Sequence, residues 1–523
     1  MQKNSSSVEQ CEHDSKEYVT VFNLNKPIDA VKTCISCGNT SNVSGVARQF
    51  FTGQEAVTSV IGTALFEELP SYKTLHETVE IHNDEDSFDF DDEVEEYLEQ
   101  EDTAKQFIAF SDSRQAAAYF ASYFSETYEE ILYRRIIVEA LKNRSETTTL
   151  YHFVNDLQAY IEQYHIIDSS DSQREAKKEA WKAILAELVN LNSGNALQNQ
   201  GFLKVDVDNN LIPGAKSWNL SKEEMADISN VLLMTMMIDA AIKYPVALNA
   251  DDKEFFLHNG HEGEFNYSDS SKSKKMKSFI PSKQNMHNRR VDYIERILTK
   301  VAPEKEAERF LELFWNSIFL SKEILVKNDK GYQVSAEKLN LVPKAKFYRC
   351  PKCHKITPYS VKGVCPTYRC SGELEEIDIA SEFADNHYYR MYQEMEIRKL
   401  RVVEHTAQLD KEKAYDYQSK FKNKQVDVLS CSTTFEMGVD VGSLETVMMR
   451  NMPPSPANYA QRAGRAGRSI KSSAYALTFC TKGNHDFSYF DEPEEMIRGR
   501  INPPIFKVEN EKIAIRHVYA SRS

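Results

Sequence analysis

Two shortages in the sequence exclude whole classes of protein. Nine cysteines among 523 residues are too few for a disulfide-stapled scaffold. No run approaches the ~18 consecutive apolar residues of a membrane span, and the polar start "MQKNSSSVEQ" lacks the pattern of a signal peptide. We therefore expect a cytoplasmic protein with no membrane partner.

The charge is unevenly distributed along the chain. Hydrophobic residues make up 41% and charged residues 27% of the sequence, as in ordinary globular proteins, and the length suggests roughly two to four domains. The formal net charge is −15, but residues 83–102 form a dense acidic run and residues 271–290 are strongly basic. We interpret both runs as solvated segments, and the negative average does not exclude a nucleic-acid partner.

Four cysteines have the spacing of a metal site, C-x2-C-x11-C-x4-C: Cys350, Cys353, Cys365 and Cys370. Four thiolates can close a tetrahedral shell around zinc, which leaves no open position for water and therefore favours a structural role. A redox-active cysteine pair is the alternative, but such pairs rarely occur beside a second pair at this spacing. We predict a structural zinc knuckle.

A second group of possible ligands lies near the start of the chain: Cys11, His13, Cys34 and Cys37. It forms either a second metal site or ordinary thiols with a surface histidine, because C-x-H is an awkward ligand pair and the intervening loop is long. Cys431 and Cys480 lie in apolar runs and are expected to be buried small side chains.

Five short apolar runs alternate with helical patterns and predict a parallel sheet covered by helices on both faces. The first run is 106–110, and the others lie within "LRVVEHTAQL", "QVDVLSCSTT", "LETVMMRN" and "SSAYALTFC". Between the first and the second, residues 146–343 carry apolar residues at three- and four-residue spacing, which indicates an inserted helical bundle.

A cluster of arginines and glycines occupies "PANYAQRAGRAGRS", residues 456–469. If the segment is one helix, three arginines lie side by side on one face: Arg462, Arg465 and Arg468. Guanidinium groups without matching carboxylates favour a multiply charged anion such as a triphosphate or a nucleic-acid backbone. The two glycines of the segment then suggest close approach of another backbone, whereas a surface basic helix with incidental glycines is the alternative.

The same residues resemble the motifs of a known enzyme superfamily. "QRAGRAGR" resembles motif VI of superfamily 2 helicases and translocases, "STTFEMGVDVG" their motif V and "FIAFSDSRQAAAYFA" their motif IV region. Together with "EHTAQL" and the cysteine knuckle, the similarity is to the zinc-bearing group related to MrfA-type repair helicases and to DISARM and Druantia phage-defence helicases. The similarity covers about a third of the chain.

The resemblance implies an α/β fold with a RecA-like parallel sheet, the second of two such domains in a helicase. The expected organisation is a connector with one helix at 1–82, an acidic linker at 83–102, RecA-like parts at 103–145 and 377–482, a helical insertion at 146–343, the zinc knuckle at 344–376 and a C-terminal extension at 483–523.

The resemblance also implies roles for single residues. Arg465 and Arg468 match the arginines that reach the γ-phosphate of ATP, which is bound with Mg, and Gln461 matches a residue that couples nucleotide state to domain closure. Expected nucleotide-side positions are Gly438, Asp440 and Arg462. Expected contacts to a nucleic-acid backbone are Ser111, Arg114, Gln115, Thr406, Ser432 and Thr433, although Ser432 stands where the family more often has threonine.

One part that the family needs is absent from these 523 residues. There is no G-x-x-x-x-G-K-[ST] phosphate-binding loop and no DE-x-H or DE-A-D box. We therefore expect the chain alone to be inactive and to require a P-loop-containing first RecA-like domain, either in a longer form of the same protein or in a separate subunit.

Two functions remain open from the sequence. The first is the C-terminal motor half of an ATP-dependent helicase or translocase that acts on DNA, as a single strand or a duplex junction, with RNA as a further option. The second is a zinc-containing interaction module that has kept the fold without the activity. Defence against phage and DNA repair are expectations drawn from the family alone.

Overall fold

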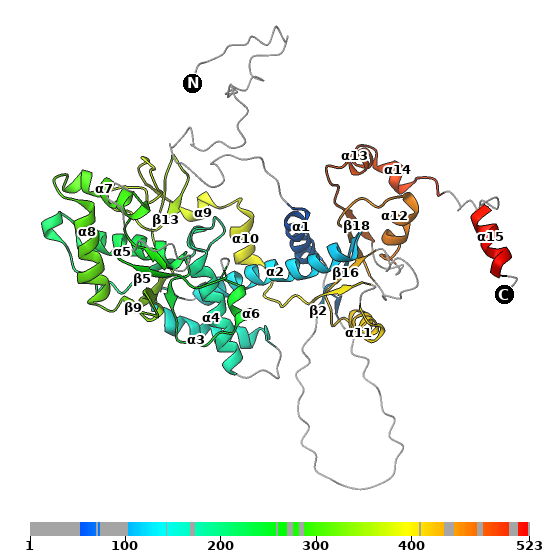
Figure 1. Ribbon diagram of the computed structural model, residues 1–523, viewed down its shortest axis with the longest axis horizontal. Helices are drawn as coiled ribbons and strands as arrows, with labels where there is room; N and C mark the ends of the chain where they lie inside the picture. The colour runs from blue at the N-terminus through cyan, green and yellow to red at the C-terminus, as the bar shows by residue number, and fades with distance from the viewer. Residues whose placement is uncertain are drawn as a thin grey trace, which may run out of the picture. The chain divides into compact units, whose positions relative to one another are not determined.

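The computed structural model describes residues 53–69, 72–73, 103–142, 144–167, 173–257, 260–268, 276–281, 287–406, 409–432, 444–467, 474–501 and 511–520. The chain forms two compact units (Figure 1). Of the described residues, those within Thr52–Glu129 and Leu400–Ser523 form the sheet unit, and those within Glu130–Lys399 form the insertion unit. Helix α2 (Arg114–Lys142) runs from the first unit into the second.

The sheet unit is built on a five-stranded sheet in the order β15-β16-β3-β17-β18, in which every neighbouring pair is parallel. The strands are β3 (Phe107–Ser111), β15 (Val402–His405), β16 (Val428–Ser432), β17 (Thr446–Met449) and β18 (Tyr475–Thr478). The predicted α/β fold with a parallel sheet is therefore confirmed, and all five expected runs are strands. The first run in sequence occupies the centre of the sheet.

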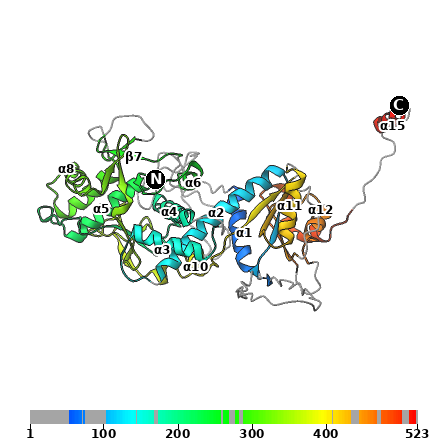
Figure 2. The ribbon, with the colours of Figure 1, turned by 90° about the horizontal axis from the view of Figure 1, so that it is seen from below.

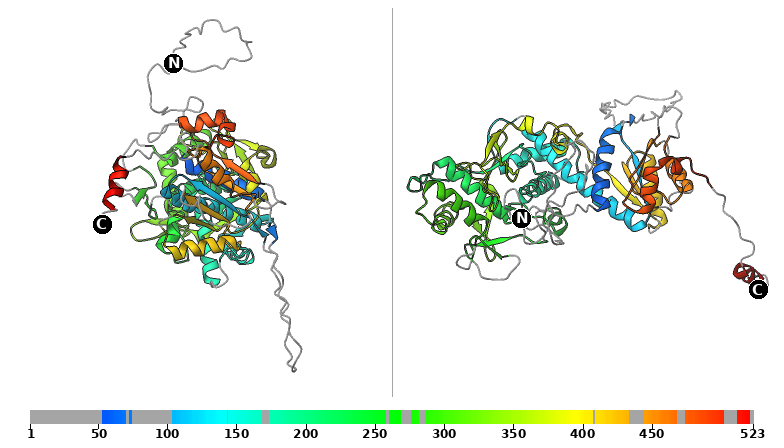
Figure 3. Two further views of the ribbon diagram at one scale, coloured as in Figure 1. Left: turned by 90° about the vertical axis from the view of Figure 1, so that its right-hand side faces the viewer. Right: turned by 90° about the horizontal axis from the view of Figure 1, so that it is seen from above.

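Helices cover both faces of this sheet. Successive side chains of a strand point to opposite sides, and every residue of β3 is buried, so both faces of the sheet must be covered. On one face, Phe107 of β3 contacts Phe124 of α2, and the Ser430 hydroxyl donates to the Ala117 carbonyl at 2.8 Å. On the other face, Ile108 and Phe110 pack in a cluster with residues of α11 (Lys411–Lys422) and α12 (Pro456–Ala463). Figures 2 and 3 show the sheet between these helices.

Helix α1 (Gln54–Glu68) belongs to the sheet unit and packs against α2. The rings of Phe66 and Tyr128 meet edge to face, and a Cβ on Gly62 would lie only 3.2 Å from the Phe124 ring. The predicted connector helix is thus a structural layer of the RecA-like sheet. The second part of this unit resumes at Leu400 rather than at the predicted residue 377.

Arg450, at the end of β17, joins these layers. Its side chain is 1% exposed; Nη1 donates to the Ser111 hydroxyl at 2.8 Å and to the Ala116 carbonyl at 2.9 Å, and Nε donates to the Thr58 hydroxyl at 3.2 Å. Nη2 lies 3.4 Å from a Glu55 carboxylate oxygen. One guanidinium therefore ties together α1, the end of β3, the start of α2 and β17.

The insertion unit is not the purely helical bundle predicted from the sequence. It contains a five-stranded sheet (β6-β10-β7-β8, with β9 on β10), a three-stranded sheet (β4-β11-β5) and the strands of the cysteine knuckle (β13-β12-β14). Most of these strands have two to four residues, for example β5 (Lys204–Val207), which is too short to show alternation in the sequence.

The helices of the insertion unit beyond α2 are α3 (Leu150–Gln163), α4 (Gln173–Val189), α5 (Lys222–Met237), α6 (Ala250–Glu254), α7 (Arg289–Val301), α8 (Ala307–Leu313), α9 (Ile379–Glu382) and α10 (His387–Glu394), with a π-helix at Phe314–Leu320 and short 3-10 helices at Lys216–Trp218 and Ala336–Lys338. Its other strands are β4 (Thr148–Thr149), β6 (Ile242–Lys243), β7 (Glu264–Asn266), β8 (Met276–Ser278), β9 (Leu325–Lys327), β10 (Tyr332–Ser335), β11 (Leu339–Val342), β12 (Phe347–Arg349), β13 (Ile356–Thr357) and β14 (Glu375–Ile377).

The sheet unit also contains β1 (Tyr72–Lys73), β2 (Thr103–Ala104), α13 (Asn484–Asp491), α14 (Pro493–Ile497) and α15 (Glu511–Ala520). In the part of the chain that the structure describes, no helix combines the length and the apolar character needed to cross a membrane.

Replacing Arg450 should destabilise the sheet unit selectively. We expect Arg450→Met to lower its free energy of unfolding by about 3 kcal/mol, because the Ser111 hydroxyl and the Ala116 carbonyl would lose a buried partner. The three tryptophans all lie in the insertion unit: Trp181, Trp218 and Trp315. Circular dichroism should therefore report the earlier unfolding of the sheet unit, while tryptophan fluorescence should not.

The matched control is Arg498→Met, whose side chain is 79% exposed in a 3.9 Å ion pair and should change stability by no more than about 0.5 kcal/mol. Equal effects of the two substitutions would contradict the role assigned to Arg450.

Candidate functional site

The carboxyl edge of the sheet collects the polar residues expected to contact nucleic acid. Ser111 ends β3 and pairs in register with Ser432, which ends β16, and Thr406 directly follows β15. All three side chains are buried, at 1–2% exposure. The Ser111 hydroxyl accepts from Arg450, so its observed role is structural.

Arg114 and Gln115 are the exposed members of the predicted nucleic-acid set. They lie in the first turn of α2, where Ser113 caps the helix by accepting a hydrogen bond from the Ala116 N–H at 3.1 Å. A groove of about 810 Å³ extends from Gln115 along α2 and is also lined by Tyr119, Val402, Glu404, Lys413 and Tyr417. The first turn of α2 therefore offers accessible donors at the carboxyl edge.

The arginine-glycine motif is not one continuous helix, and this corrects the expectation of three arginines on a single helical face. Helix α12 begins after the Ser455 cap and ends at Ala463, so Arg462 lies in its last turn and Arg465 lies beyond it. Gly464 is the cap, and the backbone then turns so that the Gly467 N–H donates to the Leu444 carbonyl at 2.8 Å.

Both glycines have a local structural reason. A Cβ on Gly464 would lie 2.8 Å from the Ala460 carbonyl oxygen. Gly467 has φ of +76°, in the left-handed region, and a Cβ there would lie 2.6 Å from the Ala474 Cβ. The glycines therefore shape the turn that carries Arg465, whereas the sequence suggested that they admit an external backbone.

Two arginines of the motif are held within the sheet unit, and Gln461 is exposed. Arg462 is fully buried; its Nη2 lies 3.3 Å from an Asp112 carboxylate oxygen, and its guanidinium lies over the Phe110 ring at 5.6 Å. Arg465 is 7% exposed and lies near Cys431. Burial raises the pKa of the Cys431 thiol, and the charge of Arg465 partly opposes that shift. Cys431 is buried as predicted, whereas Cys480 is only half-buried.

Several predicted site residues lie outside the described residues: Arg468, Thr433, Gly438 and Asp440 of the helicase motifs, and Cys11, His13, Cys34 and Cys37 of the possible second metal site.

The four cysteines of the knuckle come together. Their sulfur atoms all lie within 4.8 Å of one another, with Cys350 and Cys370 at 3.7 Å and Cys353 and Cys365 at 3.6 Å. Zinc–sulfur bonds of about 2.3 Å in a tetrahedron separate the sulfurs by about 3.8 Å. The geometry therefore fits a zinc ion bound by four thiolates.

Two further observations support this fit. A Cβ on Gly372 would lie 2.3 Å from the Cys350 sulfur, so only glycine leaves room for the sulfur cluster. The hydrogen bond between Cys353 and Cys365 lowers the pKa of Cys353 to about 4 and raises the pKa of Cys365, so the crowded thiols do not all ionise together without a cation. Bound zinc would supply that cation and hold the two loops of the knuckle together.

Sequence reasoning missed Arg450. The available signal was a single arginine directly after the apolar run "TVMM", at the carboxyl end of a strand. The neighbouring sequence does not indicate the partners of this arginine, because Thr58 and Ser111 lie hundreds of residues away.

Comparison with known proteins supports the helicase interpretation for part of the chain. The family "Helicase conserved C-terminal domain" matches residues 373–469. The chain is 45% identical to the Druantia protein DruE of Escherichia coli over 135 residues. The aligned residues make up 23% of this chain and 7% of DruE. The chain is 32% identical to the ATP-dependent helicase Lhr-Core of Methanocaldococcus jannaschii over 81 residues, 15% of this chain and 10% of the relative.

The similar solved structures match only part of the chain, and their TM-scores are low. A crystal structure of the DUF1998 helicase MrfA bound to DNA has a TM-score of 0.22 at 20% identity, over 27% of this chain and 18% of that one. Helicase Lhr of Mycobacterium smegmatis, bound to single-stranded DNA and AMP-PNP, has a TM-score of 0.21 at 22% identity. The match covers 27% of this chain and 18% of the Lhr chain. The predicted resemblance to a superfamily 2 C-terminal helicase domain is confirmed by the family match and the DruE identity, while the matched segments span only a tenth or less of these two relatives.

Metal removal provides a test of the knuckle. We expect the chain to hold zinc stoichiometrically and to lose it as the pH falls, because protons compete with the metal for the thiolates. Cys350→Ser should abolish zinc retention at the knuckle, measured by elemental analysis as the loss of one zinc per chain, whereas Cys480→Ser, outside the cluster, should leave the zinc content unchanged. Wild-type zinc content in Cys350→Ser would contradict the assignment.

Proposed function

We propose that this chain is the C-terminal motor half of an ATP-dependent superfamily 2 helicase or translocase. The proposal is based on the position of Arg465. This residue lies in a turn after α12 that is shaped by two glycines, inside the segment that matches the helicase C-terminal family. Helicases of this superfamily use ATP with Mg, and the chain lacks the loop that would bind the phosphates. A P-loop domain in cis or in trans therefore completes the site.

Arg465 acts in this proposal by stabilising charge. When the two domains close, its guanidinium approaches the γ-phosphate, where negative charge is spread over the oxygens during phosphoryl transfer. Burial within the sheet unit restrains the side chain before the partner arrives, so little conformational entropy is lost on closure. Arg468 acts as the second arginine and Gln461 as the coupling residue.

The nucleic-acid strand crosses the carboxyl edge of the sheet. Arg114 and Gln115, which are exposed, donate to its phosphates from the first turn of α2. Thr433 is a further proposed contact, whereas the buried Thr406 and Ser432 are assigned no direct contact. Contacts of this kind follow the backbone and carry no base sequence. We propose DNA as the first candidate and RNA as the second.

The Arg462–Asp112 ion pair links these two functions. Asp112 lies in the turn before Arg114, and Arg462 lies in the helical turn before Arg465. In this proposal, the 3.3 Å contact between Arg462 and Asp112 connects the nucleic-acid edge with the segment that carries Arg465 inside one unit.

The zinc knuckle has a structural role in this proposal, with Cys350, Cys353, Cys365 and Cys370 as its ligands. A non-catalytic, zinc-containing interaction module is the alternative function, and it shares the fold and the metal. Phage defence is the favoured setting because of the identity to DruE, and DNA repair is the other.

Reconstitution tests the motor. Joined to or mixed with a P-loop-containing first RecA-like domain, the chain should support ATP hydrolysis that single-stranded DNA stimulates. Arg465→Ala should lower the rate by about 100-fold or more, as loss of a transition-state cation does. Arg498→Ala is the exposed arginine control. Undiminished hydrolysis with Arg465→Ala would reject the finger role, and the absence of any stimulation would favour the interaction module.

Nucleic-acid binding by this chain provides an independent test. Arg114→Ala should weaken binding of a fluorescent single-stranded oligonucleotide to a similar degree for unrelated sequences and should reduce the salt dependence by about one phosphate contact. Fluorescence anisotropy at several salt concentrations measures both effects. A sequence-dependent loss, or none, would contradict a backbone contact at Arg114.

A further inference from the structure

The two loops of the knuckle are supported differently. The Cys350–Cys353 loop is closed by its own segment, since the Cys350 N–H donates to the Lys355 carbonyl at 3.0 Å and the His354 N–H donates to the Cys350 carbonyl at 2.8 Å. The longer Cys365–Cys370 loop also has an internal bond, from the Cys370 N–H to the Thr367 carbonyl at 3.0 Å, but three of its carbonyls accept in addition from a side chain of α7, a helix about seventy residues earlier in the chain.

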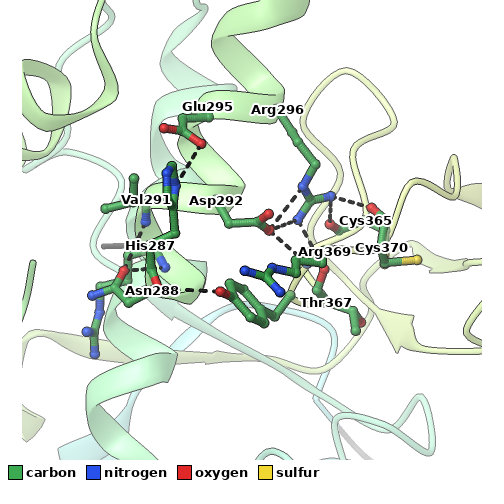
Figure 4. Close-up of polar contacts among 12 residues, drawn as sticks. His287, Asn288, Val291, Asp292, Glu295, Arg296, Cys365, Thr367, Arg369 and Cys370 are labelled. Carbon is green, nitrogen blue, oxygen red and sulfur yellow. Dashed lines mark hydrogen bonds and ion pairs between the residues drawn. The ribbon is translucent and has the colours of Figure 1, made fainter. Parts of the chain in front are cut away.

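That side chain is Arg296 (Figure 4). Its Nη1 donates to the carbonyls of Cys365 and Cys370, both at 2.7 Å, and its Nη2 donates to the Thr367 carbonyl at 3.1 Å. Two of these carbonyls belong to residues whose sulfurs are metal ligands. The guanidinium therefore fixes the backbone on which half of the ligand set is mounted.

Asp292, one helical turn earlier, holds Arg296 in place. Its Oδ2 accepts from Nε of Arg296 at 3.1 Å and from Nη2 at 2.8 Å, and it also accepts from the Arg369 N–H at 3.0 Å. The five N–H donors of the guanidinium match these five contacts, two to Asp292 and three to loop carbonyls. Lysine has only three donors on one atom and cannot reproduce this arrangement.

We propose that Arg296 and Asp292 are positioning residues of the zinc site, so that retention of the metal depends on a helix outside the cysteine segment. The proposal rests on the proposed zinc site. Residues that orient metal ligands from outside the first shell typically change metal affinity 10- to 100-fold when replaced. Both side chains are largely buried, at 23% and 15% exposure, which keeps water from replacing their contacts.

The consequence is that the insertion helices and the metal are thermodynamically linked. Zinc fixes the Cys365–Cys370 loop in the form whose carbonyls converge on Arg296, and Arg296 favours the form whose sulfurs converge on zinc. Each therefore stabilises the other by the same free energy.

Zinc affinity of the full chain tests the proposal. We expect Arg296→Met to weaken zinc binding by 10- to 100-fold in competition with a chromophoric chelator, and Arg296→Lys to recover little of this loss. Asp292→Asn should give a smaller loss in the same direction. Arg289→Met on the same helix is the control, because Arg289 is exposed and makes no hydrogen bond or ion pair to the knuckle among the described residues.

A second readout separates positioning of the metal from general stability. In the metal-free chain, the tryptophan-fluorescence unfolding midpoint of Asp292→Asn should stay near that of the metal-free wild type, whereas added zinc should raise it less than it raises the wild-type midpoint. Zinc release from this variant should be faster, and Co2+ substitution should show a perturbed tetrahedral thiolate spectrum. Unchanged zinc affinity in Arg296→Met and Asp292→Asn, or an equal loss in Arg289→Met, would overturn the proposal. A wild type that binds no zinc would reject the metal site itself, and neither result depends on the helicase proposal.

Discussion

The architecture of the sheet unit depends on the placement of β3 between β16 and β17. Strand β3 precedes β16 and β17 in sequence by more than three hundred residues, yet it pairs in parallel with both, and Phe107 lies opposite both Val428 and Thr446. The described residues within Glu130–Lys399, between β3 and β15, form the insertion unit. Arg450 secures the central strand at its carboxyl end, because its guanidinium contacts the end of β3 and both helices on one face. Burial lowers the pKa of this arginine, and its hydrogen bonds offset the cost of burying the charge.

The same principle governs the insertion unit, where a second arginine holds a distant segment in place. Arg296 uses all of its donors on Asp292 and the carbonyls of the Cys365–Cys370 loop, so the knuckle is attached to α7 by polar contacts as well as by packing. In both units, then, a largely buried guanidinium connects elements that the sequence separates. Arginine suits this role because its planar fork of five donors can bind several acceptors at fixed angles.

The sequence alone predicts much of the fold and less of the site. All five sheet strands were predictable because each is a short apolar run between helical patterns, and the cysteine spacing is specific enough to predict the cluster. The strands of the insertion were not, since pairs such as Ile242–Lys243 are too short to show a period. The arginine motif was assigned to the correct segment but with the wrong local geometry. Helical spacing predicted one face for Arg462, Arg465 and Arg468, whereas Gly464 ends the helix after Ala463. Arg450 and Arg296 could not be identified because their partners are distant in sequence.

The central claim is that Arg465 and the segment after α12 supply one wall of an ATP site, and that the phosphate-binding wall of this site is on another domain. ATP hydrolysis by this chain alone, with Mg2+ and saturating single-stranded DNA, tests it most directly. We predict a rate equal to that of Arg465→Ala and of a protein-free blank. DNA-stimulated turnover by the wild type that disappears in Arg465→Ala would contradict the account, because it would mean that the complete ATP site lies within this chain.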